Sequence, residues 1–164
     1  MFAAKKWIPV DNLADYRADL KDLGKTLVLT NGCFDLLHAG HVYALEQAAR
    51  YGDILWVGIN SDASVKRLKG PKRPIYSEQE RLYILSALEC VHGVFIFDGS
   101  DLSQEMQLIR PDVYVKSGDY SLEKLNPKER SVLEACRTKI IFTPFLPGKS
   151  TTQTLEALSQ ENYK

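Results

Sequence analysis

The chain has 164 residues, of which 45% are hydrophobic and 26% charged, and this ordinary globular usage excludes a disordered or collagen-like protein. Lysine plus arginine and aspartate plus glutamate balance at 21 each, so no overall charge draws the chain to nucleic acid or to an anionic membrane. The three cysteines are widely spaced and form no C-x-x-C pair, which is typical of neither a disulfide framework nor a zinc finger. There is no apolar run long enough for a signal peptide or a membrane span. We therefore expect one cytoplasmic domain over residues 1–164 that has no nucleic acid or membrane partner.

The predicted elements alternate between helices and strands along the chain. A first helix over residues 11–24 carries Leu13, Tyr16, Leu20 and Leu23 on one face. Short β-rich runs bounded by turn residues then predict five strands, at 26–30, 54–59, 94–97, 113–115 and 139–143. Apolar spacing and capping residues predict helices after Gly40, from Ser77, before Pro111, from Asn126 and from Ser150. The polar segment 60–76 is expected to be a long connection.

This alternation predicts β-α-β units and therefore an α/β fold, a Rossmann-like, doubly wound parallel sheet of about five strands covered on both faces. In such sheets ligands bind beyond the carboxyl ends of the strands, near the point where the strand order reverses. We therefore expect functional residues in the loops that follow strands, at 31–41, 60–76, 116–125 and 144–152.

The first of these loops holds two of the three histidines, His38 and His41, at the start of a predicted helix. Residues i and i+3 share a helical face, so both rings can point at one target. The free N–H groups of a helix N-terminus bind phosphate readily, and the glycines of this loop allow a ligand to approach the backbone. Two alternatives remain open here: a helix cap with two surface histidines, and a zinc site that adds Cys33 or Asp35.

The second loop contains a dense run of positive charge. Five of the eight residues from Lys66 to Arg73 are lysine or arginine, a local patch suited to phosphates. The alternative is a solvated charged face. Arg81, on the next predicted helix, has the corresponding alternative of an ordinary surface arginine.

The pattern Gly-Cys-Phe-Asp-x-x-His-x-Gly-His at 32–41 resembles the signature of the nucleotidyltransferase superfamily that shares its HxGH motif with class I tRNA synthetases. Further blocks are similar, in the same order, to the adenylyltransferase domain of the ADP-heptose synthases. These blocks are Asn60–Gly70, Arg73-Pro74, Glu80-Arg81, Arg110–Lys116, Gly118–Tyr120 and Ser150–Thr152. The resemblance covers roughly residues 26–158 and implies the HxGH nucleotidyltransferase fold, preceded by the helix at 11–24.

The resemblance implies that an oxygen of a heptose 1-phosphate attacks the α-phosphorus of ATP and that pyrophosphate leaves, giving ADP-heptose for lipopolysaccharide. It implies Mg²⁺ bound mainly through the ATP phosphates, and no metal held by the protein. Catalysis is assigned by resemblance to His38, His41 and Lys69, and substrate binding to Asp35, Lys72 and Arg73. Nucleotide binding is assigned to Asn31, Gly32, Cys33, Phe34, Gly40, Arg81, Lys116, Gly118, Asp119, Ser150, Thr151 and Thr152.

The sequence departs from this pattern in two places. Ser117 stands where the family usually has a second glycine, close to the expected base pocket. Pro147-Gly148-Lys149 stands where related cytidylyltransferases carry an arginine and an isoleucine, which favours ATP over CTP. A glycerol-3-phosphate-type cytidylyltransferase and a non-catalytic nucleotide-binding regulator stay open as alternatives, whereas a tRNA synthetase fragment is disfavoured by the short chain. We expect a homodimer, and a separate kinase that supplies the sugar 1-phosphate.

Overall fold

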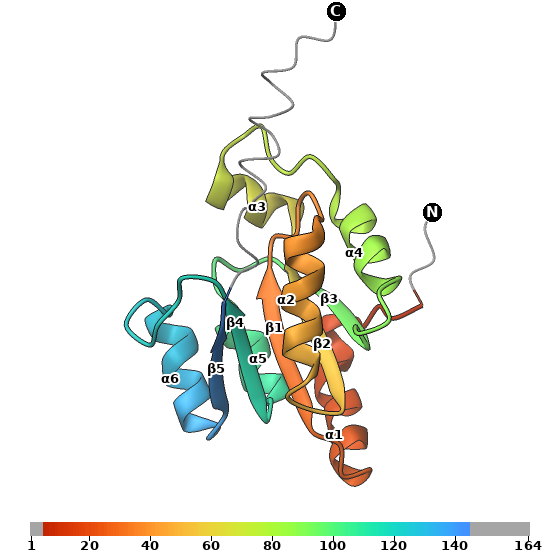
Figure 1. Cartoon of the computed structure of the whole chain (residues 1–164), viewed down its shortest axis with the longest axis vertical. Helices are drawn as coiled ribbons and strands as arrows, with labels where there is room; N and C mark the ends of the chain where they lie inside the picture. The colour runs from red at the N-terminus through yellow and green to blue at the C-terminus, as the bar shows by residue number, and fades with distance from the viewer. Residues whose placement is uncertain (1–4, 145–164) are drawn as a thin grey trace, which may run out of the picture.

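The computed structural model describes residues 5–144, and these build one sheet of five parallel strands (Figure 1). The strands are β1 (Leu27–Gly32), β2 (Ile54–Asn60), β3 (Gly93–Phe97), β4 (Val113–Ser117) and β5 (Lys139–Thr143). Their order in the sheet is β3-β2-β1-β4-β5, so the direction of winding reverses between β1 and β4. The predicted parallel, doubly wound α/β sheet is confirmed.

The helices alternate with the strands as expected, with one addition. They are η1 (Val10–Asn12), α1 (Leu13–Asp22), α2 (Ala39–Ala49), α3 (Asp62–Lys69), α4 (Glu78–Ser86), α5 (Ser103–Ile109) and α6 (Pro127–Ala135). The prediction of a featureless connection at 60–76 was wrong, because α3 occupies its first half and lies beyond the carboxyl ends of the strands (Figure 1). The helix predicted from Ser150 lies outside the described residues.

Strand side chains alternate between two apolar layers, because successive residues of a strand point to opposite faces. On β1, Leu27 and Leu29 join the layer that includes Leu13, Met106 and Leu133 from α1, α5 and α6. Val28, between them, joins the opposite layer, which includes Leu45 and Ala48 of α2 and Leu82 and Leu85 of α4. The strands are therefore buried on both faces, as a parallel sheet requires.

The predicted apolar face of the first helix was wrong in half of its members. Leu13 is buried, but Tyr16 is 46% and Leu23 71% exposed. Arg17 is buried instead, and its Nη2 atom donates to Asp112 Oδ1 at 2.8 Å. The buried face of α1 therefore includes an ion pair between Arg17 and Asp112, the residue before β4, where aliphatic packing was predicted.

The two neighbours of β1 are held very differently. Six residue pairs join β1 to β2 in register, whereas only Val28↔Val113 and Leu29↔Tyr114 join β1 to β4. The sheet therefore opens between β1 and β4 towards the carboxyl ends of these strands. Within residues 5–144, no helix is both long and apolar enough to cross a membrane.

Candidate active site

A cleft of about 850 Å³ lies at the carboxyl ends of the strands, where the sheet opens. It contains most of the candidate site residues that lie in the first three predicted loops. Its lining includes Asn31, Gly32, Cys33, Phe34, Asp35, His41, Lys69, Arg73, Lys116 and Ser117. The cleft therefore brings the histidine loop, the basic segment and the end of β4 together at the predicted place.

His38 and His41 meet at the first turn of α2. His38 is the N-cap residue, and its Nδ1 accepts from the Gly40 N–H at 3.1 Å. His41 Nδ1 accepts from the His38 N–H at 3.4 Å. In a neutral ring whose Nδ1 accepts, the proton resides on Nε2, so each neutral ring is a donor through Nε2.

Two N–H groups at the start of α2, predicted to be free to bind phosphate, have partners within the protein. The Gly40 N–H bonds to the His38 ring and the His41 N–H to the His38 carbonyl at 2.9 Å. These two N–H groups of the first turn are therefore satisfied internally. Of the two histidines, His41 lines the cleft, whereas His38 is absent from its lining. The helix-cap alternative is right about the cap, and it is compatible with a role in the cleft.

The environment of His41 keeps its ring neutral. Burial, and secondly the neighbouring His38, lower the pKa of His41 to about 4. Phe34 packs against the same ring, with centroids 5.4 Å apart. At neutral pH His41 is therefore a neutral hydrogen-bond donor and not a cation.

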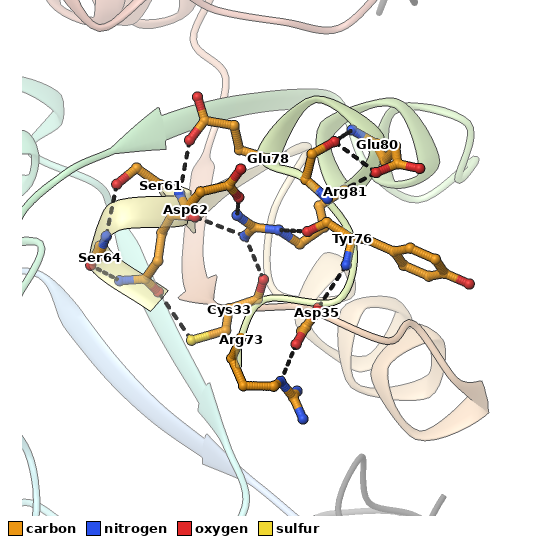
Figure 2. Close-up of polar contacts among 12 residues, drawn as sticks. Cys33, Asp35, Ser61, Asp62, Ser64, Arg73, Tyr76, Glu78, Glu80 and Arg81 are labelled. Carbon is orange, nitrogen blue, oxygen red and sulfur yellow. Dashed lines mark hydrogen bonds and ion pairs between the residues drawn. The ribbon is translucent and has the colours of Figure 1, made fainter. Parts of the chain in front are cut away.

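Asp35 is tied to the segment that follows α3. Its side chain is only 2% exposed. Its Oδ1 accepts from the N–H groups of Ile75 and Tyr76, at 2.7 and 3.1 Å, and its Oδ2 accepts from Arg73 Nε (Figure 2). The carboxylate thus links the β1–α2 loop to the basic segment, and it presents little surface to a ligand.

Arg81 is neither a surface arginine nor exposed to a phosphate. Its side chain is fully buried, and it donates to Cys33 O at 2.8 Å, to Asn60 O at 2.7 Å, to Tyr76 O at 3.1 Å and to Asp62 Oδ1 at 2.8 Å. Figure 2 shows the guanidinium at the centre of these contacts. Arg81 therefore fixes the ends of β1 and β2, and in this geometry its donors are directed at protein acceptors rather than into the cleft.

The basic run at 66–73 is divided between the cleft and the outer surface. Lys69 and Arg73 line the cleft. Lys66 and Lys72 are exposed and lie outside its lining, and Arg67 pairs with Asp98 at 3.4 Å on the surface. Both interpretations of the run therefore hold for part of it.

The ends of β4 and β1 are joined through Lys116 and Asn31. Lys116 Nζ and Tyr114 Oη both donate to Asn31 Oδ1, at 2.8 and 2.7 Å. Burial lowers the pKa of Lys116 and raises the pKa of the thiol of Cys33, which follows β1. Lys116 Nζ also lies 5.2 Å from the centre of the Tyr120 ring, within the range of a cation–π contact.

Ser117 and its neighbours form an ordered turn. The Ser117 hydroxyl lies 2.7 Å from that of Thr143, and Gly118, with φ of 116°, donates its N–H to the Thr143 carbonyl. A glycine is required at this φ. Asp119 is almost fully exposed, and its Oδ2 accepts from Lys124 at 2.7 Å, so neither Gly118 nor Asp119 lines the cleft.

Sequence reasoning missed several cleft residues, among them Asn60, Ser100, Tyr120, Lys124, Asn126 and Glu129. Tyr120 and Lys124 lie in the third predicted loop, so position alone could have indicated them. The sequence indicated Glu129 only as part of a helix start. In the structure its Oε1 accepts from the N–H of Leu102, the N-cap residue of α5, at 2.9 Å. Ser150, Thr151 and Thr152 lie outside the described residues.

The groups present do not form a metal-binding cluster of their own. Within residues 5–144, no three His, Cys, Asp or Glu side chains are grouped so that they could hold a metal ion. The zinc alternative therefore has no support among these residues. The cleft instead offers lysines, an arginine and the neutral His41 ring, which suit phosphate oxygens.

A Rossmann-like sheet with a cleft at its reversal point defines a class, the α/β proteins that bind their ligands at the carboxyl ends of the strands. The chain belongs to the family described as cytidylyltransferase-like, which it matches over residues 29–156.

Comparison with known proteins agrees with the resemblance drawn from the motifs. The chain is 46% identical over 155 residues to the bifunctional protein HldE of Geotalea uraniireducens, and 47% identical over 135 residues to that of Syntrophotalea carbinolica. These alignments cover 94% and 82% of this chain but only 31% and 27% of the relatives. The chain therefore spans less than a third of the length of the curated relatives it matches.

A solved structure, that of the lipopolysaccharide core biosynthesis protein from Thermoplasma volcanium, has the same fold. It superposes with a TM-score of 0.61 and 27% sequence identity, over 75% of this chain and 98% of that one. The predicted Rossmann-like architecture is thus confirmed independently of the motifs.

Proposed function

We propose that the chain is an adenylyltransferase that transfers AMP from ATP to a heptose 1-phosphate and releases pyrophosphate. The observation that carries the proposal is the cleft itself, which joins His41, Lys69 and Lys116 at the reversal point of the sheet. The HldE relatives and the lipopolysaccharide core biosynthesis protein support the choice of a heptose acceptor.

In this reaction an acceptor phosphate oxygen forms a bond to the α-phosphorus, and the bond from that phosphorus to the bridging oxygen of pyrophosphate breaks. No side chain forms a covalent intermediate, so positioning and charge stabilisation supply the catalysis. His38 and His41 donate through Nε2 to the oxygens on which charge develops, and Lys69 neutralises the triphosphate.

The proposal includes Mg²⁺, which in such sites is usually held partly by substrate phosphates. The cleft carboxylates Asp35 and Glu129 are already engaged by N–H donors. Phosphate oxygens and water would therefore supply most of the ligands, and the ion would neutralise charge on the phosphates.

A cytidylyltransferase acting on glycerol 3-phosphate is the second candidate, because the family description is cytidylyltransferase-like. Pyrophosphate release with ATP or CTP, against heptose 1-phosphate and glycerol 3-phosphate, separates the two. A base edge left without its hydrogen-bond partner costs about 1–3 kcal/mol, so we expect kcat/KM for ATP to exceed that for CTP at least about tenfold with the heptose acceptor.

Two other outcomes contradict the proposal. Faster turnover of CTP with glycerol 3-phosphate than of ATP with any heptose or hexose 1-phosphate favours the cytidylyltransferase. Nucleotide binding without pyrophosphate release from any pair favours the non-catalytic regulator. A homodimer, and location in the cytoplasm, remain predictions that sedimentation and cell fractionation would test.

A further inference from the structure

Arg73 is held at one edge of its guanidinium and open at the other. Its Nε donates to Asp35 Oδ2, and the side chain is 20% exposed. Among the described residues, no hydrogen bond links the two terminal nitrogens, Nη1 and Nη2, to the protein. Because Arg73 lines the cleft, this leaves a pair of donors in the same cleft as His41 and Lys69.

Asp35 also fixes the backbone next to the arginine. Its Oδ1 accepts from the N–H groups of Ile75 and Tyr76, two and three residues after Arg73. The Tyr76 carbonyl in turn accepts from the buried Arg81 (Figure 2). Both the main chain that carries Arg73 and one edge of its side chain are therefore anchored to a nearly buried carboxylate.

A guanidinium offers its donors in a rigid plane, and two parallel N–H groups match two oxygens of a phosphate. An arginine that is free to rotate loses side-chain entropy when it makes such a contact. Holding Nε in advance removes part of this cost, which is the general advantage of preorganisation.

We propose that Asp35 is a positioning residue that aims the terminal nitrogens of Arg73 at a substrate phosphate in the cleft. This inference rests on the proposed nucleotidyl transfer and assigns Asp35 a role through Arg73 rather than a direct contact with substrate. The phosphate belongs either to the nucleotide or to the acceptor, and the two share the same chemistry of recognition.

The matched control is Lys66. It belongs to the same basic segment and carries the same charge, but it is exposed and lies outside the lining of the cleft. The control variant is Lys66→Ala. Arg73→Lys keeps the charge of Arg73 but loses the paired donors. Asp35→Asn keeps one acceptor oxygen for the Ile75 and Tyr76 N–H groups, but it replaces the other oxygen by an amide donor that cannot accept from Arg73 Nε.

The first measurement is the affinity of the full chain for inorganic pyrophosphate, by calorimetry, which does not require turnover. We expect Arg73→Lys and Asp35→Asn each to weaken binding about tenfold, and Lys66→Ala less than twofold. The double variant should bind no more weakly than Arg73→Lys alone, because both changes remove the same contact. Additive losses, or unchanged binding in Asp35→Asn, would overturn the proposal.

The second measurement is the pair of KM values in the transfer assay. A raised KM for ATP places the phosphate on the nucleotide, and a raised KM for the sugar 1-phosphate places it on the acceptor. If the wild type shows no transfer but the pyrophosphate results hold, the proposed function fails while this inference stands. If Asp35→Asn does not fold, Arg73→Lys carries the test, and wild-type affinity in that variant overturns the proposal.

Discussion

The rings of His38 and His41 stack with their centroids 3.9 Å apart and their planes inclined by 29°. This contact joins the N-cap of α2 to its first turn, and both rings accept backbone N–H groups through Nδ1. The pair is therefore oriented by the helix start itself, before any ligand binds.

Replacing His41 by alanine should lower kcat by roughly 10²–10³, the usual loss for one donor to the transition state. His38→Ala should behave similarly, with a rise in KM for ATP as well. The matched control is His92→Ala, because His92 Nδ1 also accepts a backbone N–H, from Leu55, but lies outside the cleft. Near wild-type kcat in a folded His41→Ala variant would contradict the assignment.

The lowered pKa of His41 predicts a pH dependence of stability. Its pKa is about 4 in the folded chain, against 6.5 for the unperturbed group. Between these values the unfolded chain binds more protons, so the free energy of unfolding rises with pH. The contribution is complete above about pH 6.5 and is lost as the pH falls towards 4. Urea unfolding at several pH values should show a shallower rise for His41→Ala than for the wild type, and equal slopes would contradict the burial of this ring.

Lys69 should matter more than Lys66, although both are on α3. Lys69 lines the cleft and Lys66 does not. We expect Lys69→Ala to raise KM for ATP at least several-fold and Lys66→Ala to leave it nearly unchanged. Higher salt should weaken ATP binding to the wild type, because exposed charges are screened over about 8–10 Å. Equal effects of the two substitutions would mean that the run acts only as a solvated positive surface.

Arg81→Met should destabilise the fold without a direct effect on phosphate charge. Removing the guanidinium leaves the carbonyls of Cys33, Asn60 and Tyr76 without their donor, at about 1–3 kcal/mol for each group left buried without a partner. The loss of the ion pair adds less, because the Asp62 side chain is 34% exposed. The control is Arg67→Met, which removes an exposed pair with Asp98 and should cost less than about 1 kcal/mol. Urea unfolding measures both. A loss below about 1 kcal/mol for Arg81→Met would show that the buried network contributes little.

Local sequence signals were sufficient for most of the fold. The strand predicted at 139–143 has those bounds in the structure, and Ser77 and Glu80 form the predicted capping box of α4. Helix α3 was missed because only Ser64 and Val65 of its residues are buried, so it lacks an apolar stripe. The available signal was the cap, since the Ser61 hydroxyl accepts from the Ser64 N–H at 3.0 Å.

The position of the cleft could be predicted from the sequence. The contacts that each side chain makes around it could not. Histidines after a first strand indicate the right loop because the carboxyl ends of parallel strands meet at one edge. The burial of Arg81 depends on carbonyl groups of Cys33 and Asn60, which are 48 and 21 residues away along the chain. A local sequence pattern does not predict such distant acceptors. The hydrogen bond from Arg73 to Asp35, 38 residues away along the chain, could not be predicted for the same reason.

The short ladder between β1 and β4 has a mechanical consequence. His41 and Lys69 belong to the helices that follow β1 and β2, whereas Lys116 lies in β4 and Tyr120 follows it. Two residue pairs hold β1 and β4 in register, supplemented by hydrogen bonds of Leu27 with Asp112 and of Asn31 with Tyr114 and Lys116. A substrate that contacts both sides of the cleft therefore stabilises the pairing of β1 with β4, which has the fewest residue pairs in the sheet. Amide hydrogen exchange along β4 should slow on nucleotide binding, while exchange in the fully paired β2 changes little.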